Sequence, residues 1–450
     1  MQQNTTEIFR DAPVPKAVLS NVIPSIISMI MVLIYNLADT FFIGQTKNAL
    51  MVAAVSVATP AFLLFMAVGM LFGIGGTSFI SRMLGEGQEE RAKHASAFCF
   101  WTGLAVGIIS MILIVIFAEP VCKAIGASPD TIEYATQYLR IVAIGIPFLI
   151  ISNAFSNIIR SEGRAKTAMS GMIIGNMANV ILDPVMILLL GWNVAGAAIA
   201  TVIAQGISVV LCLIYIVTKA KILLPEKRHF ALDRGLYADL LAQGFSMGFM
   251  SSIIYVGSIV LQPGINSLGY ETIAGHTAAR KLFSFSMMPL SSMAQAVNTY
   301  VAQNRGADNR ERVHKGIRYA YLFCFSVTIA LIICVTPFAP TLVHLISGSS
   351  DPTVLGNGAR YLRVAIPFFF ALGLVNCSRL ALQALGEKIL PLLSSFIELF
   401  GKIIFAMVFI PRYHYSAVIW CEPIIWCFMA AELVISLYRN PYMRKGKAGN

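Results

Sequence analysis

The chain has 450 residues, of which 57% are hydrophobic and only 12% are charged, and its formal net charge is +11. Soluble globular proteins carry about 25% charged residues, so this composition excludes an ordinary soluble protein. Length alone would suggest two or three soluble domains. The apolar residues instead gather in long runs along the whole chain, which is typical of a protein that crosses a membrane many times.

Twelve apolar segments follow one another, each near the ~20 residues that a bilayer-spanning helix needs. The alternating pattern of a membrane β-barrel is absent from the sequence, so we predict an all-α integral membrane protein with twelve transmembrane helices. The predicted segments are 17–44, 52–81, 95–118, 132–158, 168–190, 194–218, 239–268, 272–303, 316–346, 355–384, 390–411 and 415–438.

Basic residues indicate the orientation of these segments. Most of the 33 Lys and Arg residues lie in the termini and in every second loop, whereas the opposite loops contain only Lys47, Lys123 and Arg412. Because basic loops stay on the cytoplasmic side, we expect a plasma-membrane protein with both termini in the cytoplasm. The positive net charge then reflects topology, so we expect membrane lipids as partners and no nucleic acid.

The chain also repeats itself. "GEGQEER" at 85–91 corresponds to "GADNRER" at 306–312, and "YLR" at 138–140 recurs at 361–363, with nearly the same offset in both cases. Matches that occur in the same order and at nearly the same offset indicate that the two halves of the chain are built alike. A structural duplication without a transport function is the alternative to a transporter built from repeats.

From this repeat we predict two lobes and a linker. The N-lobe, over 1–220, and the C-lobe, over 235–450, would each contain six transmembrane helices, and 221–234 would join them as a cytoplasmic linker. An even number of spans gives both lobes the same orientation. They should therefore be related by pseudo-twofold symmetry about an axis along the membrane normal, as in transporters with parallel repeats.

No motif for ATP hydrolysis or covalent catalysis is present in the sequence. The Gly-Lys pairs at 401–402 and 446–447 are followed by Ile403 and Ala448, so both lack the Ser or Thr of a P-loop. We find no nucleophile triad and no Cys-x-x-Cys spacing for a resident metal. We therefore expect a protein that is not an enzyme, has no cofactor and takes its energy from an ion gradient.

The first predicted segment contains a carboxylate. Asp39 lies in the middle of "LIYNLADTFFIG", and Tyr35 precedes it by one helical turn. An ionised carboxylate is costly in lipid, so Asp39 is a candidate functional group. The alternative is that Asp39 lies near a helix end and reaches water.

Three further segments carry polar side chains at helical spacing, so that the members of each set share one helix face. These residues are Asn153 and Asn157 in the fourth segment, Asn176, Asn179 and Asp183 in the fifth, and Thr201 and Gln205 in the sixth. Facing lipid would be costly, so we expect the stripes to meet inside the first bundle. Carboxylates, amides and a hydroxyl suit a hard cation such as Na⁺, and the carboxylates alone would suit a proton. Polar packing without any ion is the alternative.

Several of these stretches resemble one family of transporters. "LADTFFIG", the "RSEGRAK" loop at 160–166, "NVILDP" at 179–184 and "GAAIATVIAQ" at 196–205 are together similar to the multidrug and toxic-compound extrusion (MATE) family, in order and in spacing. The resemblance covers nearly the whole chain. It implies a twelve-helix antiporter with two six-helix lobes around a central cavity.

The resemblance also implies a function and a site. Members of the family export amphipathic, often cationic compounds against Na⁺ or H⁺. The family's cation site in the N-lobe matches Asp39, Asn179, Asp183 and Thr201 here. We expect the coupling ion to bind there, small amphipathic organic compounds as substrates, and a monomer.

The second half departs from the first. Ile259 falls where Asp39 stands, and no acidic residue occurs between 245 and 268, so a second cation site in the seventh segment is not expected. Glu398 and Lys402, at i and i+4, should pair with each other. We expect Glu422 to lie at a cavity wall and Arg379 to tie helices together rather than to bind substrate.

A flippase for lipid-linked saccharides, from the same superfamily, is the alternative function. It would have about fourteen spans and a strongly cationic cavity for a pyrophosphate group. The basic residues Arg280, Lys281 and Arg379 favour this alternative, whereas the number of predicted spans opposes it.

Overall fold

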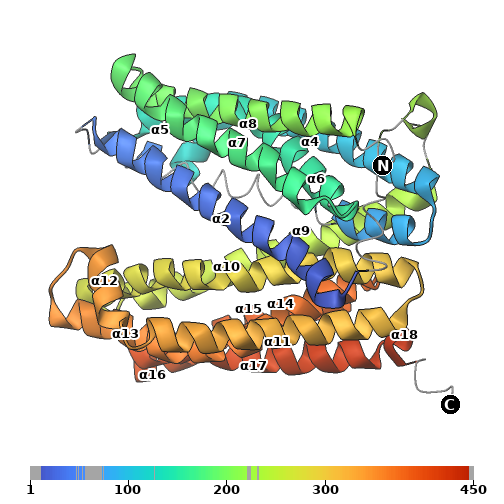
Figure 1. The fold of residues 1–450 in the computed structure, drawn as a ribbon. Helices are drawn as coiled ribbons and strands as arrows, with labels where there is room; N and C mark the ends of the chain where they lie inside the picture. The colour runs from blue at the N-terminus through green and yellow to red at the C-terminus, as the bar shows by residue number, and fades with distance from the viewer. Residues whose placement is uncertain are drawn as a thin grey trace. The chain divides into compact units, whose positions relative to one another are not determined.

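The computed structural model describes residues 12–46, 48, 50–52, 54–55, 73, 75–125, 127–219, 224, 226–230 and 233–444. These residues are almost entirely helical, and none of them forms a strand (Figure 1). Most of the second predicted segment lies outside the described ranges. The chain divides into two compact units, unit 1 with residues 23–248 and unit 2 with residues 249–444 together with 12–22.

Unit 1 contains the helices that correspond to the first half of the chain. They are most of α2 (Val14–Gly44), α4 (Glu89–Ile125), α5 (Ile132–Ile144), α6 (Ile146–Ser161), α7 (Ala165–Asp183), the π-helix η1 (Pro184–Leu189), α8 (Asn193–Thr218), the 3₁₀ helix η3 (Lys227–Phe230) and the first part of α9 (Arg234–Asn266). Apolar side chains of α4, α6, α7 and α8, among them Phe155, Ile158, Met169 and Ile216, form much of its core.

Unit 2 contains the rest of the chain. After α9 come α10 (Tyr270–Gly306), α11 (Arg310–Val335), α12 (Ala339–Ser347), α13 (Pro352–Ala365), η4 (Ile366–Phe368), α14 (Phe369–Ala384), α15 (Leu390–Ile404), the π-helix η5 (Phe405–Phe409), α16 (Ile410–Tyr413), α17 (Tyr415–Arg439) and α18 (Pro441–Arg444). The lobe boundaries at 220 and 235 stay a prediction, since the two compact units divide the chain within α9 instead.

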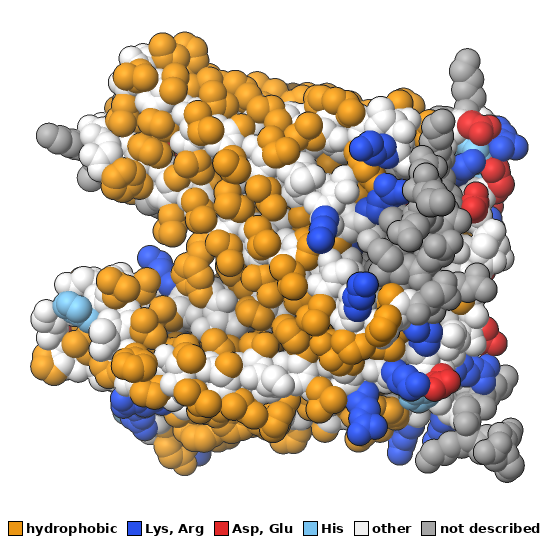
Figure 2. Space-filling view, in the orientation of Figure 1, with side chains coloured by type: hydrophobic (Ala, Val, Ile, Leu, Met, Phe, Trp, Pro, Cys, Tyr) orange, Lys and Arg blue, Asp and Glu red, His pale blue; other side chains and the backbone are white. Residues whose placement is uncertain are grey.

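The described residues form nine helices that are long and apolar enough to cross a membrane, or ten when α5 and α6, bent by 47°, count as one span. Helix α10 is long enough to cross a membrane but is more polar than these helices, because polar residues recur along it, among them Arg280, Lys281, Gln295 and Asn298. In Figure 2 hydrophobic side chains cover most of the visible flank of the helices in each unit. The predicted all-α membrane fold is thus confirmed.

Backbone geometry repeats between the two units. Gly163 and Gly386 both have positive φ, +88° and +97°, at the turns after α6 and α14. Asn193 and His414 share φ +49°, a conformation that non-glycine residues rarely adopt. The π-helices η1 and η5 also begin at corresponding positions. The duplication seen in the sequence therefore extends to individual bends of the backbone.

The turn between α6 and α7 contains a buried carboxyl group. Glu162, in the "RSEGRAK" stretch, is only 6% exposed, and its Oε2 lies 3.7 Å from Nε of Arg164. Burial raises the pKa of Glu162 to about 7, although Arg164 partly opposes this shift. The folded state therefore holds a proton on Glu162 more tightly than the unfolded chain does.

This proton makes the stability of the turn depend on pH. The stabilisation is fully present below the ordinary pKa of 4.5 and is lost as the pH rises through about 7, where the carboxylate must be buried with its charge. Glu162→Gln should remove this dependence. Between pH 4.5 and pH 8 the free energy of unfolding of the parent should fall by about 1 to 3 kcal/mol relative to that of the variant. Thermal unfolding of the purified parent and variant at both pH values would measure this change in stability. Parallel pH profiles for parent and variant would contradict the prediction.

Candidate cation-binding site

Two buried carboxyl groups meet in unit 1. Asp39 of α2 is 7% exposed, and Asp183, the last residue of α7, is fully buried. Each carboxyl group lies within electrostatic range of the other. Two buried carboxylates within electrostatic range repel each other strongly when both are ionised, so a bound proton or metal cation would stabilise the pair.

Asn179 and Thr201 complete this group. Nδ2 of Asn179 donates to Oδ1 of Asp183 and to Oγ1 of Thr201, both at 3.4 Å, which is long for a hydrogen bond. Three buried oxygens, Oδ1 of Asp39, Oδ1 of Asn179 and Oδ2 of Asp183, have no hydrogen-bond partner among the described residues. Orphaned acceptor oxygens on three side chains fit a hard cation, which takes oxygen ligands.

A small polar cavity adjoins this cation site. It has a volume of about 70 Å³, so it holds water or a small ion but no drug-sized compound, whose pockets measure roughly 300 to 1,000 Å³. Six predicted residues line it: Tyr35, Asn153, Asn176, Asn179, Thr201 and Gln205. The structure thus brings together polar stripes from α2, α6, α7 and α8.

A glycine allows α7 and α8 to approach closely at this cavity. A Cβ atom on Gly175 would lie 2.7 Å from the carbonyl oxygen of Ala204 and would also clash with Ser208. The close packing that Gly175 permits places Asn176 and Asn179 opposite Thr201 and Gln205.

Three predicted residues, Asp39, Asn157 and Asp183, do not line the cavity, and one residue that lies near the site was not predicted. Asn157 donates from Nδ2 to the carbonyl oxygen of Asn153 at 2.8 Å, which is an interaction within α6. Tyr138 of α5 is buried and lies within electrostatic range of Asp39, Tyr35 and Asp183. Tyr138 begins the repeated "YLR" triplet, which was the one sequence signal that could have identified it.

A chain of charged residues runs through unit 2. Nζ of Lys402 donates to Oε1 of Glu398 at 2.8 Å, as predicted, and lies 4.0 Å from Oε1 of Glu422. Oε2 of Glu422 accepts from Nη1 of Arg280 at 2.6 Å and from the hydroxyl of Tyr361 at 3.1 Å. The four charges come from α10, α15 and α17 and sum to zero.

Arg379 lies apart from the cavity that Arg280 lines. Its Nε and Nη2 donate to Oγ of Ser394, at 3.1 and 2.8 Å, so it joins α14 to α15 as predicted. Lys281 is exposed, and only Arg280 of the three basic residues lines the polar cavity of unit 2. This cavity therefore lacks the strongly cationic lining that a pyrophosphate would need.

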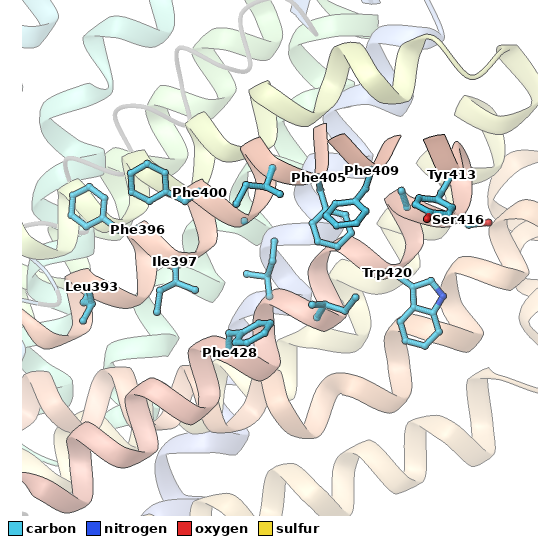
Figure 3. Close-up of a pocket in the computed structure, with 15 residues that line it drawn as sticks. Leu393, Phe396, Ile397, Phe400, Phe405, Phe409, Tyr413, Ser416, Trp420 and Phe428 are labelled. Atoms are coloured by element: carbon cyan, nitrogen blue, oxygen red, sulfur yellow. The ribbon is translucent and has the colours of Figure 1, made fainter. Parts of the chain in front are cut away.

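A separate apolar groove runs along unit 2. Figure 3 shows side chains of α15, η5 and α17 on its walls, among them Phe396, Phe405, Trp420 and Phe428. Its volume is about 750 Å³, and its lining contains no charged side chain. Phe400 and Phe428 are 59% and 65% exposed, as expected for side chains that contact lipid. The groove therefore has no part in the cation site.

Comparison with known proteins decides the family. The model of the MatE family matches residues 24–185 and 247–408, which together make up most of the chain. The chain belongs to the MatE family. The resemblance seen in the sequence is confirmed, and the two matches are separated by the same offset as the two "YLR" copies.

Relatives of the MatE family and solved structures match this chain over nearly its whole length. The multidrug export protein MepA of Staphylococcus saprophyticus is 25% identical over 450 residues, which cover 98% of this chain and 97% of the relative. MepA of Staphylococcus aureus strain NCTC 8325 is 25% identical over 446 residues with the same coverage. A crystal structure of MATE in the bent conformation has a TM-score of 0.90 at 23% identity, covering 97% of both chains.

A second solved structure has the same fold. It is the outward-facing conformation of a multidrug resistance MATE family transporter of the MOP superfamily, with a TM-score of 0.87 at 23% identity. The alignment covers 97% of this chain and 96% of that one. These likenesses establish the fold of a membrane transporter.

Proposed function

We propose that this protein is a secondary active multidrug exporter, which moves amphipathic, often cationic organic compounds out of the cell in exchange for Na⁺ or H⁺. The burial of two carboxyl groups, Asp39 and Asp183, together with the unpartnered oxygens of Asp39, Asn179 and Asp183, carries the proposal, because a bound cation would stabilise this group. The relatives named multidrug export proteins support the substrate class.

The coupling follows from where the site residues lie. Asp39 lies on α2, Asp183 and Asn179 on α7, and Thr201 on α8, so a bound cation joins three helices of unit 1. Binding neutralises one buried negative charge, and release restores it. Occupied and empty sites therefore favour different arrangements of these helices, which is the bistability that alternating access requires.

An ion gradient is a sufficient source of energy. One charge that moves through 100 mV releases about 2.3 kcal/mol. A tenfold ion gradient adds about 1.4 kcal/mol. For a neutral substrate, one cation per cycle would therefore sustain an outside accumulation of about several hundredfold. The protein would need no cofactor and would catalyse no chemical reaction.

We also propose the cellular setting. The distribution of Lys and Arg places both termini in the cytoplasm of a cell whose plasma membrane the protein spans. In Figure 2 most of the visible Lys and Arg side chains lie toward one end of the helices in each unit, which is consistent with contact to anionic lipid headgroups. We propose that the transporting species is a monomer.

The choice between Na⁺ and H⁺ makes a prediction about two neutral residues. A proton needs only the carboxyl groups, whereas Na⁺ needs several oxygens at once. The orphaned Oδ1 of Asn179 favours Na⁺. Asn179→Ala and Thr201→Ala should each raise the half-saturating Na⁺ concentration for transport by about tenfold, the cost of one charge-assisted ligand.

Counterflow in proteoliposomes, with Na⁺ and pH gradients imposed separately, tests both the function and the ion. Ser170→Ala, on an exposed part of α7 away from the cavity, is the matched control and should keep the parent's Na⁺ response. A parent protein driven fully by a pH gradient, with both alanine variants unaffected by Na⁺, would identify a proton antiporter. Absence of transport under every gradient would contradict the proposed function.

A further inference from the structure

Unit 2 contains a polar cavity of about 270 Å³, well above the ~30 Å³ share of one water molecule. Helices α9, α10, α13 and α17 form its walls. Its polar lining residues are Ser258, Gln262, His276, Thr277, Arg280, Tyr361 and Glu422. The proposed cation site lies in unit 1, and none of its residues lines this cavity.

Arg280 presents unused hydrogen-bond donors to this cavity. Its Nη1 donates to Tyr361 at 2.9 Å and to Glu422 at 2.6 Å, and its guanidinium lies 4.8 Å from the ring centre of Phe283. Among the described residues its hydrogen bonds use Nη1 alone, and its side chain is 37% exposed. Nε and Nη2 therefore remain as three N–H donors in the planar geometry that matches a carboxylate.

Glu422, by contrast, is more enclosed and already uses one of its oxygens. Oε2 accepts two hydrogen bonds, from Arg280 and Tyr361, and Oε1 lies 4.0 Å from Nζ of Lys402. The Glu422 side chain is only 15% exposed. A cationic ligand would therefore meet an enclosed carboxylate that already pairs with Arg280, whereas an anionic ligand would meet open donors.

We propose that this cavity binds the carboxylate of amphipathic substrates, through Nε and Nη2 of Arg280. Tyr361 and Glu422 hold the guanidinium in place through Nη1, and the hydroxyl groups of Ser258 and Thr277 lie on the same cavity wall. The inference rests on the proposed export function for its substrates and extends it to zwitterionic and acidic compounds.

The repeat supports this assignment. Tyr361 is the counterpart of Tyr138 in the second copy of "YLR", and Tyr138 lies beside the carboxyl pair of unit 1. The same position of the repeat thus adjoins a buried charged centre in each unit. In unit 1 that centre consists of carboxyl groups, and in unit 2 its accessible group is a guanidinium.

Two dyes that differ only at a carboxyl group test the proposal. Rhodamine 19 is a free benzoic acid, and rhodamine 6G is its ethyl ester with the same xanthene cation. Fluorescence anisotropy with the purified full-length protein in detergent measures both affinities without any ion gradient. Arg280→Met combined with Glu422→Gln removes the guanidinium without leaving Glu422 unpaired. It should weaken rhodamine 19 binding by about tenfold or more and change rhodamine 6G binding by less than about twofold.

Two further variants distinguish the loss of the binding site from a loss of folding. Ser258→Trp fills the cavity and keeps every charge, and it should cause the same loss for the acid. Arg363→Met, an exposed arginine of α13 that bonds the carbonyl of Thr336, is the matched control and should leave both affinities unchanged. Thermal unfolding of each variant reports whether the fold is retained.

The outcomes distinguish this inference from the export function. Unchanged binding of the acid in both cavity variants, or an equal loss for acid and ester, would overturn the inference. Export of rhodamine 6G by the parent in proteoliposomes tests the function by itself. Acid binding that depends on Arg280, without export of either dye, would support the site and contradict the exporter.

Discussion

Replacing Asp39 with Asn should abolish substrate accumulation driven by an imposed Na⁺ or H⁺ gradient, with at least a hundredfold loss of uptake into inside-out vesicles. The amide keeps the shape of the side chain and can donate a hydrogen bond to Asp183, so the fold of unit 1 should be retained. The variant lacks the charge that the cation must neutralise, and without that charge the empty and occupied sites no longer differ. Asp183→Asn should have the same effect.

The control for this experiment is a carboxylate in another membrane segment. Glu432 of α17 accepts a hydrogen bond from Ser436 at 3.0 Å and lies outside the site. Glu432→Gln should therefore leave the gradient response as it is in the parent. If Asp39→Asn transports at the parental rate under either gradient, Asp39 does not carry the coupling ion.

The membrane-spanning segments could be predicted well because their apolar composition is imposed by lipid rather than by a particular packing partner. The segment at 194–218 corresponds to α8, Asn193–Thr218, and that at 272–303 to α10, Tyr270–Gly306. The hydropathy of α10 is low, and of its charged residues Arg280 pairs with Glu422 within unit 2. The sequence located it because the apolar stretches around the charges are long enough for a span.

Breaks within the spans were predicted less well. The segment at 132–158 is two helices, α5 and α6, bent by 47° at Gly145. The segment at 316–346 is also two helices, α11 and α12, and Pro337 and Pro340 at the break were an available signal. The π-helix after Asp183 begins at Pro184, which was the same kind of signal, whereas the π-helix Phe405–Phe409 contains no proline and depends on how the helix packs.

The polar residues of the cation site could be predicted because i, i+3, i+4 and i+7 spacing fixes a shared helix face without any tertiary information. That rule found Asn176, Asn179 and Asp183, and it found the pairing of Glu398 with Lys402. It cannot join Arg280 to Glu422, which are 142 residues apart. Contacts between distant helices follow from packing, which no local pattern encodes.

Removing one partner of the buried Glu398–Lys402 pair should strongly destabilise unit 2. Lys402 is only 2% exposed, and Glu398 is 8% exposed. A Cβ atom on Gly257 of α9 would lie 2.9 Å from Cδ of Lys402, so the lysine stem is tightly enclosed. Glu398→Gln leaves the ammonium buried without its partner at 2.8 Å, which should cost about 3 kcal/mol, the lower end of the range for such a loss. The lower end is expected because Glu422, 4.0 Å away, partly compensates.

A double-mutant cycle separates the loss of the pair from the loss of either side chain. Glu398→Gln combined with Lys402→Met removes both charges and should recover much of the stability, measured as the midpoint of thermal unfolding in detergent. Glu311 and Lys315 have the same i, i+4 spacing at 2.6 Å but are 77% and 61% exposed, so Glu311→Gln should leave the midpoint unchanged. If Glu398→Gln were as stable as the parent and yet failed to transport, Glu398 would belong to the transport machinery and not to the packing of unit 2. A stable variant that still transports would show that Glu422 alone suffices as the partner of Lys402.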